Sequence, residues 1–185
     1  MQRMRKLFAL FGVEESELVF YLRDEESADT AIGSRHEIRK KYWEYALPAI
    51  KTAFGGNGPF SNVNPVANNY VSGFIGIPGV CINCVSNFDG ARVELYLGMA
   101  EKGQNKAVFD HLFMRKEEIE AAMGSELAWS RSDENKSSKI SCILTDVDIS
   151  RETDWPRMAQ FHAEQGAAIL AAFKKHLEEY FNTTI

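Results

Sequence analysis

The stretch Arg92-Val93-Glu94-Leu95-Tyr96-Leu97 decides the fold class of this chain, because its polar and apolar residues alternate strictly. Successive side chains of a β-strand point to opposite faces of the sheet. The apolar residues of the stretch therefore share one face, and the polar residues share the other. This pattern predicts a strand in a sheet with one buried face and one face open to solvent, as antiparallel sheets commonly have.

Four further segments extend this strand into a sheet. Pro78-Gly79 and Asn87-Phe88-Asp89-Gly90 are turn signals that separate three successive strands, the last of which is 92–97. Two more strands lie on either side of the polar loop 132–138. Short connections between successive strands favour antiparallel pairing. The strands predicted in addition to 92–97 are 70–77, 80–87, 127–129 and 140–145.

Three segments have the three-and-four spacing of apolar residues that is typical of an amphipathic helix. The first begins at Ser34-x-x-Glu37, which matches a capping box, and Pro48 predicts a kink inside it. The second ends before Gly124, a residue that commonly follows the last turn of a helix. The predicted helices are 34–54, 105–123 and about 155–181.

The predicted order of elements is α-β-β-β-α-β-β-α, which indicates an α+β fold. We expect a mainly antiparallel sheet of about five strands with helices packed on one face. Residues 1–33 are interpreted as an N-terminal arm, and residues 34–185 as a single α+β domain.

Composition and charge limit the classes of function. The chain has 21 Lys and Arg against 26 Asp and Glu, and its formal charge of −5 argues against nonspecific coating of nucleic acid. Three cysteines are too few for a disulfide framework, so we expect a reducing, cytoplasmic environment. No apolar run reaches the roughly 18 residues that span a bilayer, and no membrane association is expected.

Motifs for catalysis and metal binding are weak in this chain. Cys81 and Cys84 are three residues apart in a predicted strand, so they face opposite ways and cannot hold one metal ion. Tyr96 stands where a restriction-type nuclease needs a lysine. Asp146 and Asp148 follow a strand and are the remaining candidates for Mg²⁺, but a solvated turn is the favoured interpretation. No catalytic residue and no cofactor are predicted.

Basic and aromatic side chains gather instead in two segments. One is the basic stretch 35–51 of the first predicted helix, and the other is the polar face of the sheet. An open sheet that bears arginine and tyrosine can contact phosphate or stack on bases, although such a face is more often only solvated. The candidate nucleic-acid-binding residues are Arg39, Lys40, Lys41, Arg92, Tyr96 and Lys139.

Short motifs lie along the chain at Tyr42-Trp43, Arg92-Val93-Glu94-Leu95-Tyr96, Asn105-Lys106, Phe109, Ile119-Glu120, Leu127-x-Trp129, Lys139-Ile140 and Asp154-Trp155. Their order resembles that of the Domain of Unknown Function 4268 family over about residues 36–181. The resemblance implies the fold of that family, many of whose members lie C-terminal to a nuclease-like domain of the restriction-endonuclease superfamily. It also implies an accessory or recognition module in DNA metabolism or defence, without catalytic residues to transfer. The first 33 residues are too few to supply a nuclease half.

These observations lead to an expected function and two alternatives. We expect a non-catalytic accessory domain that binds nucleic acid or a nuclease-type protein of a restriction or defence system. The first alternative is a protein-interaction or homodimerisation module with no role in nucleic-acid binding. The second is a Mg²⁺-dependent hydrolase that uses Asp146 and Asp148.

Overall fold

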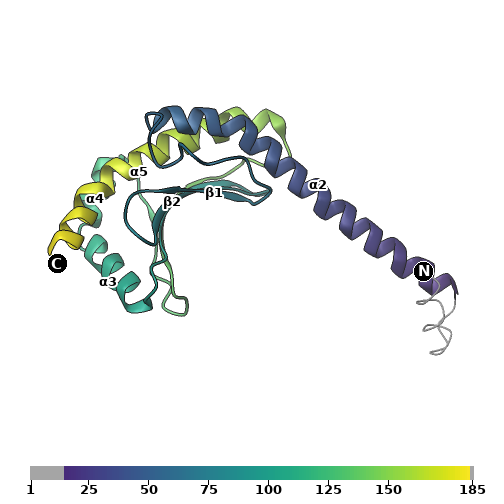
Figure 1. Cartoon of the computed structure of the whole chain (residues 1–185), viewed down its shortest axis with the longest axis horizontal. Coiled ribbons are helices and arrows are strands. Elements are labelled where there is room, and N and C mark those ends of the chain that lie inside the picture. Colours follow the sequence, from purple (N-terminus) through teal and green to yellow (C-terminus); the bar gives the residue numbers. More distant parts are fainter. Residues whose placement is uncertain (1–14, 184–185) are drawn as a thin grey trace. The chain divides into compact units, whose positions relative to one another are not determined.

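Figure 1 shows the computed structural model of the chain, which describes the backbone of residues 15–183 and the side chains of residues 33–182. The chain divides into two compact units, Met1–Glu37 and Ile38–Ile185. The described part of the first unit is helical, and the second unit holds the sheet. The elements are α2 (Glu15–Ala53), β1 (Tyr70–Phe74), β2 (Val80–Ser86), β3 (Ala91–Leu97), α3 (Lys102–Phe113), α4 (Lys116–Met123), β4 (Ala128–Ser130), β5 (Ser138–Leu144), a 3₁₀ turn (Glu152–Asp154) and α5 (Trp155–Thr183).

The five strands form one sheet in the order β1-β2-β3-β5-β4, and every neighbouring pair is antiparallel. The apolar face predicted for 92–97 is confirmed, because Val93, Leu95 and Leu97 are all buried in β3, whereas Arg92 and Tyr96 on the other face are partly exposed. The α+β class, the antiparallel sheet and the order α-β-β-β-α-β-β-α are confirmed as well.

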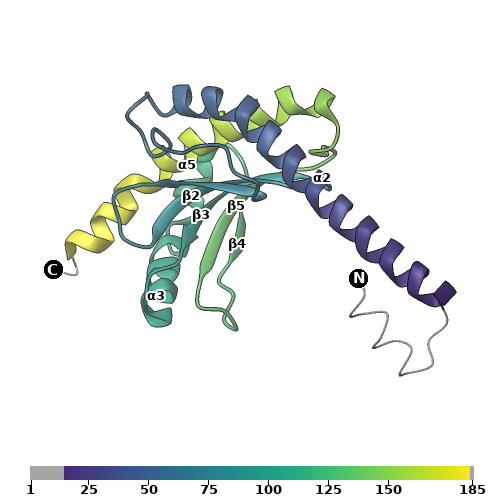
Figure 2. The same ribbon diagram turned by 45° about the vertical axis from the view of Figure 1, so that its right-hand side comes forward.

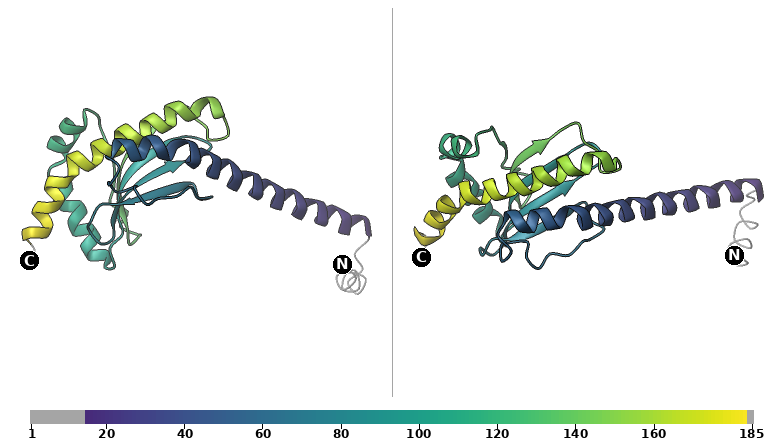
Figure 3. Two further views of the ribbon diagram at one scale, coloured as in Figure 1. Left: turned by 45° about the horizontal axis from the view of Figure 1, so that its top comes forward. Right: turned by 90° about the horizontal axis from the view of Figure 1, so that it is seen from above.

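The core lies between one face of the sheet and a layer of helices. Helix α5 crosses β2, β3 and β5, and residues 38–53 of α2 lie beside it (Figures 2 and 3). Burying apolar side chains from both layers supplies the main driving force for this packing. Within residues 15–183, none of the helices is both long and apolar enough to cross a membrane. The side chains at the centre of the core include Trp43, Ile50, Ile82, Leu95, Ile140 and Phe173.

The predicted helix start at Ser34 is wrong. Helix α2 begins at Glu15 and continues through Gly33 and Ser34 to Ala53. A capping box requires a first residue outside the helix, whereas Ser34 lies in its interior. Glycine within a helix costs only about 1 kcal/mol, which is not enough to stop a helix that is already formed.

The single helix predicted at 105–123 is two helices, α3 and α4, separated at Met114 and Arg115. The backbone N–H of Arg115 bonds to Leu112 O, at three residues instead of four. The Arg115 guanidinium group donates a hydrogen bond to His111 O at 3.0 Å. In a continuing α-helix, the backbone N–H of Arg115 would donate to that oxygen instead. The break therefore comes from a side chain that competes with the backbone, which helical periodicity does not reveal.

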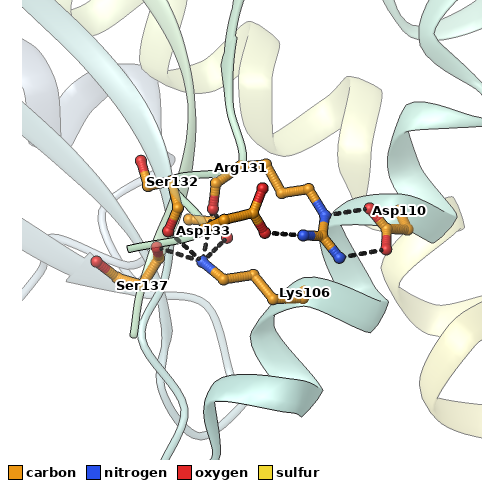
Figure 4. A network of polar contacts seen from close by, with 7 residues as sticks. Lys106, Asp110, Arg131, Ser132, Asp133 and Ser137 are labelled. Atoms are coloured by element: carbon orange, nitrogen blue, oxygen red, sulfur yellow. Dashed lines mark hydrogen bonds and ion pairs between the residues drawn. The ribbon is translucent and has the colours of Figure 1, made fainter. Parts of the chain in front are cut away.

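Lys106 of α3 is buried and holds the hairpin between β4 and β5 (Figure 4). Its Nζ donates to the carbonyl oxygens of Arg131, Ser132 and Ser137 at 2.6, 2.9 and 2.9 Å, and to Ser138 Oγ at 3.0 Å. Arg131 in turn forms a bidentate ion pair with Asp110 of α3, in which Nε and Nη2 donate to the two carboxylate oxygens. The hairpin is thus attached to α3 by one buried cation and one surface ion pair.

Candidate binding surface on the open face of the sheet

The register of the strands arranges the side chains of the open face in three rows. Residues paired across neighbouring strands lie side by side on the same face. The middle row is polar over its whole length, and aromatic or charged residues stand on both sides of it. The rows are Tyr70, Val85, Arg92 and Ile143; Ser72, Asn83, Glu94 and Ser141; and Phe74, Cys81, Tyr96 and Lys139.

A hollow of about 380 Å³ lies on this face. Arg92, Tyr96 and Lys139, which the sequence analysis proposed from alternation alone, all line it. Arg39, Lys40 and Lys41 do not belong to its lining. They lie on α2, where Lys40 and Lys41 are exposed and the Arg39 guanidinium carbon is 6.0 Å from the centre of the Phe88 ring. The structure therefore brings three of the six candidates together.

Glu94 is on the polar face as expected, but it is buried, with only 2% of its surface exposed. Buried carboxylates need hydrogen-bond partners, and the neighbouring strands supply them. Asn83 Nδ2 donates to Glu94 Oε1 at 3.0 Å, and Arg92 Nε donates to Glu94 Oε2 at 2.9 Å. Ser72 Oγ donates to Asn83 Oδ1 at 2.7 Å, which fixes the amide orientation. The centre of the surface is thus a chain of hydrogen bonds across three strands.

This chain of hydrogen bonds orients the guanidinium group of Arg92. Only its Nε is bonded to Glu94, and within the described part of the chain its two Nη groups have no hydrogen-bond partner. A guanidinium group held in this way presents a fixed pair of donors that suits phosphate or carboxylate oxygens. Arg92 is about one third exposed, so a ligand in the hollow can reach it.

Tyr96 and Lys139 are directly paired across β3 and β5. The Lys139 ammonium nitrogen lies 6.0 Å from the centre of the Tyr96 ring, at the limit of a cation–π contact. The ring leans over Gly98, where an added Cβ atom would meet Tyr96 Cε1 at 2.2 Å. Gly98 therefore makes room for the aromatic ring on the surface.

Replacing Gly98 with alanine is expected to displace the Tyr96 ring, because a Cβ atom cannot share its space. If the ring is part of a ligand site, affinity for that ligand falls while every charge on the surface stays the same. The measurement is ligand affinity together with the tyrosine ring signals in NMR spectra. Gly103→Ala is the control, since a Cβ atom there would meet no described residue within 4 Å outside its own helix backbone. Unchanged Tyr96 signals in the Gly98 variant would contradict the prediction.

The two cysteines of β2 point to opposite faces, as the sequence predicts. Cys84 is fully buried in the core, and Cys81 lines the hollow. Burial raises the pKa of the Cys81 thiol, and the nearby Glu94 carboxylate acts in the same direction. Cys81 is therefore a neutral thiol at neutral pH, and its Sγ lies 3.4 Å from Asn83 Oδ1.

Asp146 and Asp148 lie in the turn between β5 and the last helix. Asp146 is exposed and has a positive φ of 61°, and its carboxylate accepts a hydrogen bond from Thr145. Asp148 Oδ1 accepts hydrogen bonds from the backbone and side chain of Ser150, both at 2.7 Å. Among the described residues, no group of three or more His, Cys, Asp or Glu side chains is placed to hold a metal ion.

Sequence reasoning missed Ser72 and Asn83 as members of this surface. The signal for Asn83 was present, because Cys81, Asn83 and Val85 alternate along β2 with Val80, Ile82 and Cys84, which belong to the core. Its meaning depends on the register, which places Asn83 beside Glu94. Neither residue is charged, and each acquires a role only from the partner that the neighbouring strand brings.

Comparison with known proteins gives one family match. The sequence model of a family described as "Domain of unknown function (DUF4268)" matches residues 38–177. No curated protein and no solved structure matches the chain. The matched range contains the whole sheet and most of the helix layer, including every residue that lines the hollow.

Proposed function

The chain belongs to the DUF4268 family, and we propose from the geometry of its open sheet face that it is a non-catalytic module that binds single-stranded nucleic acid. One observation carries the proposal: a single hollow presents a fixed guanidinium group, an aromatic ring and an ammonium group on adjacent strands. Single-stranded nucleic acid is bound by this combination of stacking and phosphate contacts. The resemblance to accessory domains of nucleases adds a nuclease-type protein as the expected partner.

The charges of the hollow support a local contact. Arg92 and Lys139 contribute two positive charges and Glu94 contributes one negative charge, which leaves one net positive charge on a protein with a net charge of −5. With so few charges, the affinity is expected to fall as the salt concentration rises, but part of it is expected to remain at high salt. Stacking on Tyr96 supplies the uncharged part of the affinity, about 1–3 kcal/mol per base.

The test is fluorescence anisotropy with labelled oligonucleotides of thymidine or uridine at low salt. Tyr96→Leu keeps an apolar side chain but removes the aromatic ring, and it is expected to weaken binding about tenfold. Lys139→Glu is expected to weaken binding further and to lower the salt slope by about 0.7, the value for one lost phosphate contact.

Lys136→Glu is the matched control, because Lys136 is an exposed lysine of the same hairpin that does not line the hollow. It makes the same charge change and is expected to leave binding within about twofold of wild type. Equal losses for Lys136→Glu and Lys139→Glu would show a general charge effect and contradict the proposed site. The absence of binding to DNA and RNA strands at low salt would overturn the proposal.

A further inference from the structure

Strand β1 is an outer strand of the sheet, and the backbone groups of three of its five residues face away from β2. Ser86 N donates to Asn69 O at 2.8 Å, which makes Asn69 and Ser86 a hydrogen-bonded pair. Such pairs alternate along an antiparallel ladder, so Val71 and Gly73 also face β2. The N–H and C=O groups of the alternate residues face outward, and within the described chain no segment bonds to them. These residues are Tyr70, Ser72 and Phe74.

This edge lacks the features that usually keep sheet edges apart. Proteins protect exposed edges with charged residues, proline, bulges or very short strands. The opposite edge, β4, is only three residues long. β1 has five residues, none of them charged or proline, and Tyr70 and Phe74 are 45% and 58% exposed. A groove of about 770 Å³, which the loop 57–63 lines in part, borders Ser72 and Phe74, so open space lies beside this part of the edge.

The sequence of β1 is complementary to itself in one antiparallel register. When a two-fold axis passes beside Ser72, the two copies of Ser72 form a hydrogen-bonded pair, and Tyr70 of each copy pairs with Phe74 of the other. All outward backbone groups of Tyr70, Ser72 and Phe74 are then bonded. The exposed rings form two aromatic pairs on the open face of the sheet, an arrangement that stabilises paired strands.

We infer that the chain forms a two-fold symmetric dimer in which β1 pairs with β1 of a second copy in this register. The two five-stranded sheets become one sheet of ten strands, and both polar hollows lie on the same face. The partner is a second copy because the edge offers aromatic residues at both ends of a strand centred on Ser72. This inference is independent of nucleic-acid binding.

The first test is the molar mass of the purified full chain by light scattering and sedimentation over a range of concentrations. Wild type is expected to be a dimer, and Ser72→Pro a monomer, since proline lacks the N–H group needed at the axis. The ladder to β2 does not use that N–H group, and proline is tolerated in outer strands. Phe113→Lys is the control, because Phe113 is 49% exposed at the end of α3 and should not affect the dimer.

A second test addresses the register and does not depend on the proline variant folding. Tyr70→Lys combined with Phe74→Lys places like charges opposite each other across the axis, and this variant is expected to be a monomer. Tyr70→Lys combined with Phe74→Glu places opposite charges in the same positions, and this variant is expected to dimerise. Circular dichroism establishes that both fold. A monomeric wild type, or the same mass for both double variants, would overturn the inference.

Discussion

Lys106→Met is expected to lower the free energy of unfolding by about 3 kcal/mol, because it removes the ammonium donor from three loop carbonyl oxygens. Two of these oxygens, those of Arg131 and Ser132, keep another donor. Methionine retains much of the apolar stem of lysine, so the loss reports on the ammonium group. Burial lowers the pKa of Lys106, as do the nearby positive charges of Lys102 and Arg131. The cost of burying the charge therefore offsets part of the gain from its hydrogen bonds, and the expected loss is smaller than their sum.

The measurement for Lys106 is urea unfolding followed by tryptophan fluorescence, with hydrogen exchange of the hairpin 131–137 as a local readout. Lys136→Met is the matched control, since Lys136 is an exposed lysine in the same hairpin. A substitution of that kind usually changes stability by less than about 0.5 kcal/mol. If both variants lost equal stability, the hydrogen bonds from Lys106 to its four acceptors would not account for the loss, and the prediction would be wrong.

The second large effect concerns His162 and pH. His162 is fully buried, its Nε2 lies 3.1 Å from Val85 O, and its Nδ1 lies 2.8 Å from the hydroxyl of Tyr42. A carbonyl oxygen only accepts, so Nε2 carries the proton and Nδ1 accepts from Tyr42. Burial lowers the pKa of His162 from 6.5 to about 4, because the charged imidazolium would lose its hydration.

The sign of the pH effect follows from that shift. Between about pH 6.5 and pH 4 the unfolded chain binds a proton at His162 that the folded chain does not bind, so stability falls as the pH falls. The contribution of His162 is complete above pH 6.5. It has decreased by about 2 kcal/mol at pH 5 and by about 3 kcal/mol below pH 4.

His162→Gln tests this, because glutamine has a donor and an acceptor but does not titrate. Unfolding midpoints in urea at about pH 7.5 and pH 5 are expected to differ less in this variant than in wild type. His36→Gln serves as the control, since His36 is exposed on α2 and its replacement should keep the wild-type pH dependence. Identical pH dependence in wild type and His162→Gln would contradict a neutral buried imidazole.

The predictions from sequence were strongest where a local pattern repeats. Alternation in 92–97 predicted the buried and open faces of β3, and the three residues Arg92, Tyr96 and Lys139 proved to line one hollow. Helix boundaries were less predictable. Ser34-x-x-Glu37 matched a capping box inside a longer helix, and Arg115 interrupts a segment whose apolar spacing is helical throughout.

The candidate site depended on the sequence and the tertiary structure in different ways. Alternation placed Arg92, Glu94 and Tyr96 on one face, but it treated the three as equally exposed. Strand pairing brings Asn83 beside Glu94 and makes that carboxylate a buried support for Arg92. The sequence did not distinguish the basic residues of α2 from those of the sheet as candidates, but the residues of α2 do not line the hollow.

By itself, the sequence determined the fold class and the faces of the strands, because burial imposes a period of two on strands and 3.6 on helices, and these periods are written in neighbouring residues. Only the tertiary structure decided which polar groups are partners. Lys106 with the hairpin 131–138, His162 with Tyr42, and the outward edge of β1 each depend on segments that meet in space or on a register between strands. Hydrogen bonds act over about 3 Å, so a pattern along the chain does not report contacts between residues that are distant in sequence.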